Sequence, residues 1–161
     1  MVLGLGKEGQ AYINLRHCSD CVINLPEPSQ WTQVESIAHG TGRRDVPAVK
    51  QEMGYEFMPD KFAVAGWTRA ASVKVTPDRV MSCPLQIEAQ MVRIHELAKA
   101  ADEDHDTTFV IIETRTLQVH AHANIVVPNS DKIDLSQWAP LLYAFRHYMA
   151  ASGPLGSNFR A

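Results

Sequence analysis

Residues 85–91, Leu-Gln-Ile-Glu-Ala-Gln-Met, decide the fold class, because apolar and polar side chains alternate through them without a break. Successive side chains of a β-strand point to opposite sides of the sheet, so a period of two predicts a half-buried antiparallel strand. Residues 109–119 are rich in valine, isoleucine and threonine and predict a second strand. The acidic, polar residues 102–106 lie between the two runs and predict a hairpin-type loop.

The rest of the chain predicts shorter elements. Strands are expected at residues 1–5, 21–25 and 125–127, the last two ended by Pro26 and Pro128. Helices are expected at residues 11–17, at 29–38 with Ser29 as N-cap, and at 47–53, whereas residues 61–66 form either a helical turn or a loop. The spacing of Trp138, Leu141, Leu142 and Phe145 predicts a final helix, followed by a tail over residues 152–161.

This order of elements suits a single β-rich α+β domain over residues 1–161, built as an antiparallel barrel with short inserted helices. It does not suit a doubly wound parallel sheet, which needs strands and crossover helices in alternation. Only four or five strands are predicted, which is few for a closed barrel. We therefore expect another subunit to cover the open sheet edges.

The composition excludes several classes of protein. The chain has 161 residues and a net charge of −3, so nucleic acid and anionic membranes are poor candidates as partners. No apolar run is long enough to span a membrane, and the start lacks the cationic and apolar regions of a signal peptide. Three cysteines do not describe a disulfide framework, which favours a reduced, cytoplasmic setting.

A glycine-rich turn at residues 4–9, Gly-Leu-Gly-Lys-Glu-Gly, is the first candidate site. It matches the dinucleotide fingerprint, but the strand before it and the helix after it are too short for a Rossmann unit. In a second interpretation, the free N–H groups at the start of a helix bind one phosphate. Lys7 would add positive charge, and Gln10 and Asn14 could donate further hydrogen bonds. A third interpretation is a plain, solvated turn.

Other constellations are weaker. Cys18 and Cys21 have redox or zinc spacing but end a helix and open a strand, so structural cysteines are expected. His120 and His122 could bind a metal together with His95 or His105, yet no carboxylate pattern supports this and no metal is predicted. No serine–histidine–aspartate order or nucleophile elbow is present, so the catalytic residues stay unknown. Residues 146–148, Arg-His-Tyr, form a polar and aromatic cluster at the expected end of the last helix.

Several segments, taken in order, form a recognisable set. They are residues 3–6, 14–16 and 21–26 (Cys-Val-Ile-Asn-Leu-Pro), residues 55–66 with Asp-Lys-Phe and a glycine, residues 83–89, and Ile133-Asp134 with Trp138 and Pro140-Leu141. Together they resemble the flavin reductase-like family with the FMN-binding split barrel. The likeness covers nearly the whole chain. Family members usually carry two more strands before the point where this chain begins, so the resemblance implies a split barrel that lacks its first two strands.

The resemblance implies a homodimer with one FMN per subunit, in which NAD(P)H passes hydride to the flavin. It also implies that reduced flavin can supply a partner monooxygenase. The phosphate corner falls at the glycine-rich turn, Lys61 and Phe62 match the Lys-Phe of the family, and the end of the last helix lies toward the flavin. The predicted cofactor-binding residues are Gly6, Lys7, Gly9, Gln10, Ala11, Asn14, Lys61, Phe62, Arg146 and Tyr148.

The two missing strands and one further departure from the family leave an alternative open. Gly9 and Ala11 stand where relatives tend to carry hydroxyl groups around the phosphate. Each charge-assisted hydrogen bond lost there costs about 1.5–3 kcal/mol. The alternative is therefore a degenerate, non-catalytic split-barrel protein with weak or no FMN binding, acting as a ligand-binding or interaction subunit.

Overall fold

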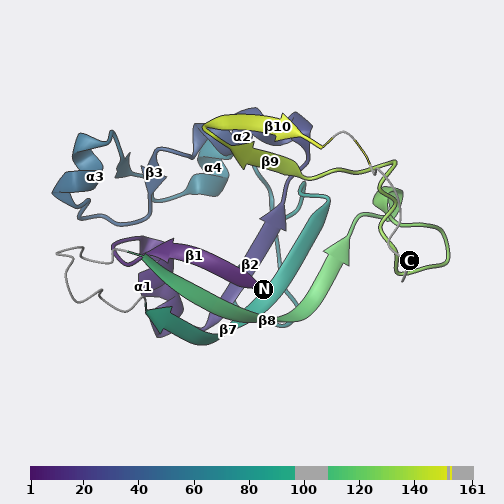
Figure 1. The fold of residues 1–161 in the computed structure, drawn as a ribbon, viewed down its shortest axis with the longest axis horizontal. Helices are drawn as coiled ribbons and strands as arrows, with labels where there is room; N and C mark the ends of the chain where they lie inside the picture. The colour runs from purple at the N-terminus through teal and green to yellow at the C-terminus, as the bar shows by residue number, and fades with distance from the viewer. Residues whose placement is uncertain (97–108, 152, 154–161) are drawn as a thin grey trace.

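A curled antiparallel sheet forms the body of the molecule in the computed structural model, which describes residues 1–96, 109–151 and 153 (Figure 1). The sheet has the strand order β1-β8-β7-β2. Its strands are β1 (Val2–Gly6), β2 (Asp20–Leu25), β7 (Leu85–Glu96) and β8 (Phe109–Ala121). The fold is therefore the expected β-rich α+β fold, with a sheet rolled into half of a barrel.

The long β7–β8 pair is the centre of this sheet, as the alternation of residues 85–91 predicts. The pairing runs from Leu85 opposite Ala121 to Glu96 opposite Val110. Register shifts follow Glu88 and Met91. Extra residues of this kind bend a strand and increase its twist, which accounts for the curl. The hairpin loop predicted at residues 102–106 lies outside the described residues.

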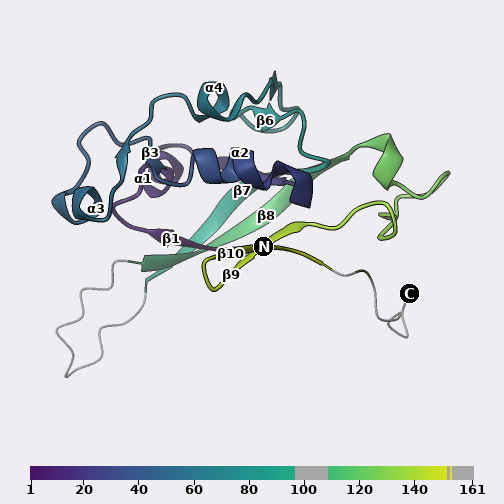
Figure 2. The same cartoon turned by 90° about the horizontal axis from the view of Figure 1, so that it is seen from above.

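The remaining elements are short, and most lie on one side of the sheet (Figure 2). The helices are α1 (Gln10–His17), α2 (Trp31–Ser36), α3 (Ala48–Glu52) and α4 (Lys61–Ala65), with 3₁₀ turns η1 (Pro28–Gln30) and η2 (Ala123–Ile125). The short strands are β3 (Gly40–Thr41), β4 (Glu56–Phe57), β5 (Arg69–Ala70) and β6 (Arg79–Val80). No helix in the described part of the chain is long and apolar enough to cross a membrane.

The helices expected near residues 11–17 and 47–53 are confirmed as α1 and α3. The uncertain segment at residues 61–66 is a helix, because the Asp60 carboxylate accepts hydrogen bonds from Phe62 N and Ala63 N and caps its start. The N-cap predicted at Ser29 is wrong. A 3₁₀ turn starts at Pro28, and Glu27 and Gln30 form its capping box.

Two predictions in the last third of the chain are wrong. Instead of a final helix, the chain forms a hairpin of β9 (Leu141–Ala144) and β10 (His147–Ala150), with Tyr143 opposite Tyr148. Apolar residues that lie three or four positions apart also fit a hairpin, because each of its strands can present one apolar side. The Leu141 N–H donates to Pro26 O at 2.8 Å and holds the start of β9 beside Pro26. The strand expected at residues 125–127 is the end of η2, followed by a single bridge from Val126 to Ile133.

The apolar core lies between α1 and the sheet. Tyr12 and Leu15 of α1 pack on Val110 and Ile112 of β8, and Ile112 is fully buried. Tyr12 and Leu15 are three residues apart, so they lie on one side of the helix. This packing fixes the start of α1 at one end of the half-barrel.

At the other end of the sheet the buried side is polar. Gln86 and Glu88 are 2% and 0% exposed, whereas Leu85 and Ile87 are only half-buried. The alternation of residues 85–91 therefore predicts the strand correctly, but not which of its sides is covered. A period of two carries no information about what packs on either side.

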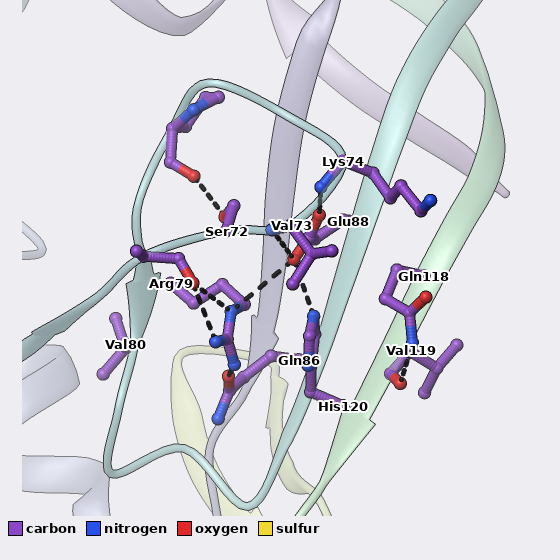
Figure 3. A network of polar contacts seen from close by, with 12 residues as sticks. Ser72, Val73, Lys74, Arg79, Val80, Gln86, Glu88, Gln118, Val119 and His120 are labelled. Atoms are coloured by element: carbon purple, nitrogen blue, oxygen red, sulfur yellow. Dashed lines mark hydrogen bonds and ion pairs between the residues drawn. The ribbon is translucent and has the colours of Figure 1, made fainter.

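Glu88 is the centre of a buried polar cluster that fastens residues 71–80 onto the sheet (Figure 3). Its carboxylate accepts hydrogen bonds from Val73 N at 2.9 Å and Lys74 N at 2.5 Å. His120 Nε2 lies 2.6 Å from it, and Arg79 Nε lies 3.6 Å away. Three hydrogen-bonding groups and one guanidinium, from residues 71–80 and from β8, therefore surround one carboxylate that water does not reach.

Neighbouring side chains extend this cluster. Arg79 donates to Gln86 Oε1 at 2.5 Å and to Ala71 O at 2.8 Å. Val80 N donates to Asn24 Oδ1 at 2.9 Å. Side chains of the sheet thus bind backbone N–H groups of residues 71–80, and the Arg79 side chain binds Gln86 of the sheet. The segment is therefore held at several points along its length.

The cluster predicts that stability falls in acid. Burial raises the pKa of Glu88, but hydrogen bonds from Val73, Lys74 and His120 outweigh it and hold the pKa below the ordinary 4.5. Since the folded pKa is the lower one, the stabilisation is complete above 4.5 and is lost as the pH falls through the folded pKa. Urea unfolding between about pH 7 and 3 measures this loss. Glu88→Gln should show a smaller loss, and an unchanged pH dependence would contradict the prediction.

Candidate functional site

The glycine-rich turn leads into the uncapped start of α1. Gly9 N donates to Gly6 O at 2.9 Å, and Gly9 is the N-cap residue with extended backbone. No side chain caps this helix, and its first intrahelical bond is Ile13 N to Gly9 O at 3.3 Å. The N–H groups of Gln10 and Ala11 therefore form the partial positive end of the helix, where an anion is favoured.

Two cations that sequence patterns did not single out approach this turn from residues 40–57. Lys50 Nζ lies 3.9 Å from the position that a Cβ on Gly9 would take. Arg43 Nη1 donates to Glu8 O at 3.2 Å. The predicted Lys7 forms an ion pair with Glu96 at 3.6 Å instead of pointing freely into solvent. The fold therefore supplies positive charge from α3 and from the loop before it, which no local pattern connects to the turn.

A pocket of about 410 Å³ opens beside the turn. Gly6 and Gly9 form one part of its lining, and Lys50, Tyr55 and Phe109 form another. Exposed Val49 and Met53 line its α3 side, and Glu8 is the acidic residue of the lining. The pocket thus combines one cation with two aromatic rings and lies next to the uncapped start of α1, which suits a ligand with a planar apolar part and a phosphate at its edge.

Of the other residues predicted at the helix start, Gln10 lies beside Gly42, whereas Ala11 and Asn14 line a different hollow. Gln10 Nε2 donates to Asn14 Oδ1 at 2.7 Å. Ala11 and Asn14 line a separate hollow of about 360 Å³ together with Leu3 and Cys21. The structure therefore brings Gly6, Lys7, Gly9, Gln10, Ala11 and Asn14 together at one end of α1, around the helix rather than in one pocket.

Lys61 and Phe62 lie on α4 and have partners within the protein. Lys61 Nζ donates to Ile37 O at 3.2 Å and ties α4 to the end of α2, and burial lowers its pKa. The Arg69 guanidinium lies over the Phe62 ring, 4.1 Å from its centre. No hydrogen bond or ion pair between described residues joins this pair to the start of α1.

Arg146 and Tyr148 lie on the β9–β10 hairpin and not at the end of a helix. The Tyr148 hydroxyl donates to Glu35 at 2.9 Å, and its ring lies 6.0 Å from that of Trp31. Burial, and then the Glu35 carboxylate, raise the pKa of Tyr148. Arg146 and Tyr148 line a hollow of about 390 Å³ with Trp31. This hollow is separate from the pocket beside α1.

The cysteines and histidines considered from the sequence have ordinary surroundings. All three cysteines are free, and burial followed by the Glu27 charge raises the pKa of Cys83 to about 11. His120 contacts Glu88, and His122 Nε2 lies 3.0 Å from Met81 O. The predicted alternative partner His105 lies outside the described residues.

The fold recurs in solved structures of other proteins. Flavoredoxin of Desulfovibrio vulgaris is 19% identical, with 99% of this chain and 75% of that chain covered and a TM-score of 0.73. Nitrilotriacetate monooxygenase component B from Bacillus cereus is 15% identical, with 98% and 69% covered and a TM-score of 0.68. The NADH:FAD oxidoreductase SgcE6 of Streptomyces globisporus is 10% identical, with 94% and 68% covered and a TM-score of 0.61.

At the level of sequence, no model of a known protein family matches the chain. The uncharacterized protein YdfE of Bacillus subtilis is 36% identical over 161 residues, which are 100% of this chain and 74% of YdfE. An identity of this size over the whole chain establishes common descent. The chain therefore belongs to the same family as YdfE, and this family has the split-barrel fold of flavin reductases and flavoredoxins.

Proposed function

We propose that this protein is a flavin-binding oxidoreductase that works as a homodimer, binds FMN and passes hydride from NAD(P)H to the flavin. The observation that supports it best is the uncapped start of α1, with Lys50 and Arg43 beside it, at a turn within a split-barrel fold. The oxidoreductase and the monooxygenase component that share this fold support the electron donor and the use of reduced flavin by a partner monooxygenase.

The residues at the start of α1 fit the phosphate of FMN. A phosphate needs several hydrogen-bond donors and positive charge, and α1 offers the N–H groups of Gln10 and Ala11. The hydroxyl groups expected at positions 9 and 11 are absent, but Lys50 brings a full charge close to Gly9. Gly9 also leaves room, since a Cβ there would lie 3.1 Å from Gly6 O.

The protein groups would bind and orient, while the flavin supplies the ability to accept hydride and release electrons. Lys50 and the α1 N–H groups would hold the phosphate, with Lys7 close to the same turn. Tyr55 and Phe109 would form the apolar walls of the adjoining pocket. Such walls exclude water from a planar ring and fix its orientation.

A second candidate is the non-catalytic split-barrel protein with weak or no FMN binding. Two observations favour it. Lys61 and Tyr148, expected near the flavin, are engaged by Ile37 O and Glu35. Glu8 places a carboxylate among the residues that line the pocket, and a carboxylate repels phosphate.

Titration of the purified protein with FMN, followed by flavin fluorescence, tests the site. Lys50→Gln should weaken FMN binding about 10- to 100-fold, the effect of one lost charge-assisted hydrogen bond. Lys132→Gln is the matched control, because Lys132 is exposed near Ser130 and lies outside the pocket lining. An absence of FMN binding and of flavin-dependent NAD(P)H oxidation by the unaltered protein would favour the non-catalytic alternative.

A further inference from the structure

One acidic side chain in the pocket beside the start of α1 has no partner in the described part of the chain. Glu8 lines this pocket together with Gly9 and Lys50, and its side chain is exposed. The hydrogen bond that Glu8 makes there uses its backbone carbonyl, which accepts from Arg43 Nη1 at 3.2 Å. The carboxylate of Glu8 is therefore available to a ligand.

The turn before α1 separates this carboxylate from the lysine next to it. Gly9 N donates to Gly6 O at 2.9 Å, so Lys7 and Glu8 are the two central residues of a tight turn. Lys7 forms an ion pair with Glu96 of β7 at 3.6 Å. Glu8 lines the pocket instead. Its neighbour in the sequence therefore does not neutralise it.

The cation of the pocket lies beside an aromatic ring. Lys50 Nζ is 6.0 Å from the centre of the Tyr55 ring and 3.9 Å from the position that a Cβ on Gly9 would take. Among the described residues it forms no ion pair with Glu8. The pocket thus presents a free positive charge and a free carboxylate at the same time.

A carboxylate and a phosphate need different partners. An ionised carboxylate only accepts hydrogen bonds, so its partner in a ligand has to be a donor. An ionised phosphate offers no donor, and its charge repels the carboxylate. Glu8 therefore does not bind a phosphate itself. It suits a ligand that carries hydroxyl or N–H groups next to its phosphate.

The place of Glu8 in the sequence limits which part of a ligand it reaches. Glu8 comes directly before the N-cap residue Gly9, next to the N–H groups that suit a phosphate. In FMN the part that adjoins the phosphate is the ribityl chain with its hydroxyl groups, whereas the ring N–H lies at the opposite end of the molecule. Dinucleotide-binding proteins use an acidic residue in a similar way, to bind the hydroxyl groups of a ribose.

We propose that Glu8 binds the ribityl hydroxyl groups of the flavin and makes the site select a phosphorylated polyol over a simple phosphate. The inference rests on the FMN binding of the proposed function and adds a residue that determines its selectivity. It also gives a role to a carboxylate that would otherwise only weaken the binding of an anion.

Calorimetric titration of the 161-residue protein with riboflavin and lumiflavin tests this role. Riboflavin carries the ring and the ribityl chain, whereas lumiflavin carries the ring without that chain. Glu8→Ala should weaken riboflavin binding about 3- to 10-fold, the effect of one lost hydrogen bond at an exposed site. The same substitution should leave the affinity for lumiflavin unchanged.

Inorganic phosphate should respond in the opposite direction. Glu8→Ala removes a negative charge from the pocket, so phosphate should bind about 2- to 5-fold more tightly, measured by its competition with FMN. Glu52→Ala is the matched control, because Glu52 is an exposed glutamate of α3 outside the pocket lining. It changes the net charge by the same amount and should leave the affinities for riboflavin and phosphate unchanged.

The outcomes separate the two proposals. An unaltered protein that binds neither FMN nor riboflavin refutes the flavin site and, with it, the role of Glu8. If the unaltered protein binds FMN and Glu8→Ala binds riboflavin at least as tightly, only the role of Glu8 is refuted. Equal weakening of riboflavin and lumiflavin also refutes it, because the substitution would then act on the ring or on the shape of the turn.

Discussion

Replacing Glu88 by alanine should lower the free energy of unfolding by about 3–5 kcal/mol, the usual cost of removing one partner of a buried ion pair. The carboxylate is fully buried and contacts Arg79 and His120. Without it, Val73 N and Lys74 N lose their acceptor. Residues 71–80 would then lose their main attachment to the sheet, and unsatisfied groups would stay buried.

Urea unfolding of matched variants measures this effect. Glu113→Ala removes a glutamate from the neighbouring strand β8, where it is 48% exposed and paired with His95. Exposed pairs of this kind contribute about 0–1 kcal/mol, so this control should change little. Glu88→Gln keeps the size and one acceptor oxygen and should fall between the two. Equal effects of Glu88→Ala and Glu113→Ala would show that the cluster does not fasten the segment.

Sequence patterns predict where the strands of this protein lie better than they predict which side of each strand is buried. The alternation in residues 85–91 locates β7, because the period of side chains along a strand is a local property. Whether Glu88 or Ile87 becomes buried depends on residues 71–80, which reach the sheet only through the tertiary fold. No local sequence pattern therefore predicts that Glu88 is buried.

The hairpin error has a related cause. Leu141, Leu142 and Phe145 have a helical spacing. In the fold, however, Leu141 N donates to Pro26 O, and the Tyr148 hydroxyl donates to Glu35 of α2. Tertiary contacts override a short apolar pattern of this kind. Arg146 and Tyr148 were expected at the end of a helix. Because the segment is a hairpin, they lie instead beside Trp31, in a hollow separate from the pocket beside α1.

The candidate site was predictable in part. A glycine turn before a helix is a local signal, and it correctly locates the uncapped start of α1. Lys50 and Arg43 could not be assigned to it, because they are more than thirty residues away and approach only through the path of residues 40–57. Sequence reasoning therefore located the turn and the helix start of the candidate site, but could not connect the charges of Lys50 and Arg43 with them.

Replacing Ile112 by alanine should lower the free energy of unfolding by about 2–5 kcal/mol, because it leaves a cavity in a packed core. Ile112 is fully buried against Tyr12 and Leu15 of α1. Ile111 is the matched control, since it is the same residue type one position away on the outer side of β8. Ile111→Ala should cost less than about 1 kcal/mol in the isolated chain.

Unfolding at low and high protein concentration makes the comparison stronger. Ile112→Ala removes contacts within one chain, so its effect should be the same at both concentrations. Ile111 is 39% exposed in the single chain, so Ile111→Ala should have the smaller effect at both concentrations, and any growth of its effect with concentration would measure association. If Ile111→Ala costs as much as Ile112→Ala even in the dilute protein, the outer side of the sheet is covered within a single chain.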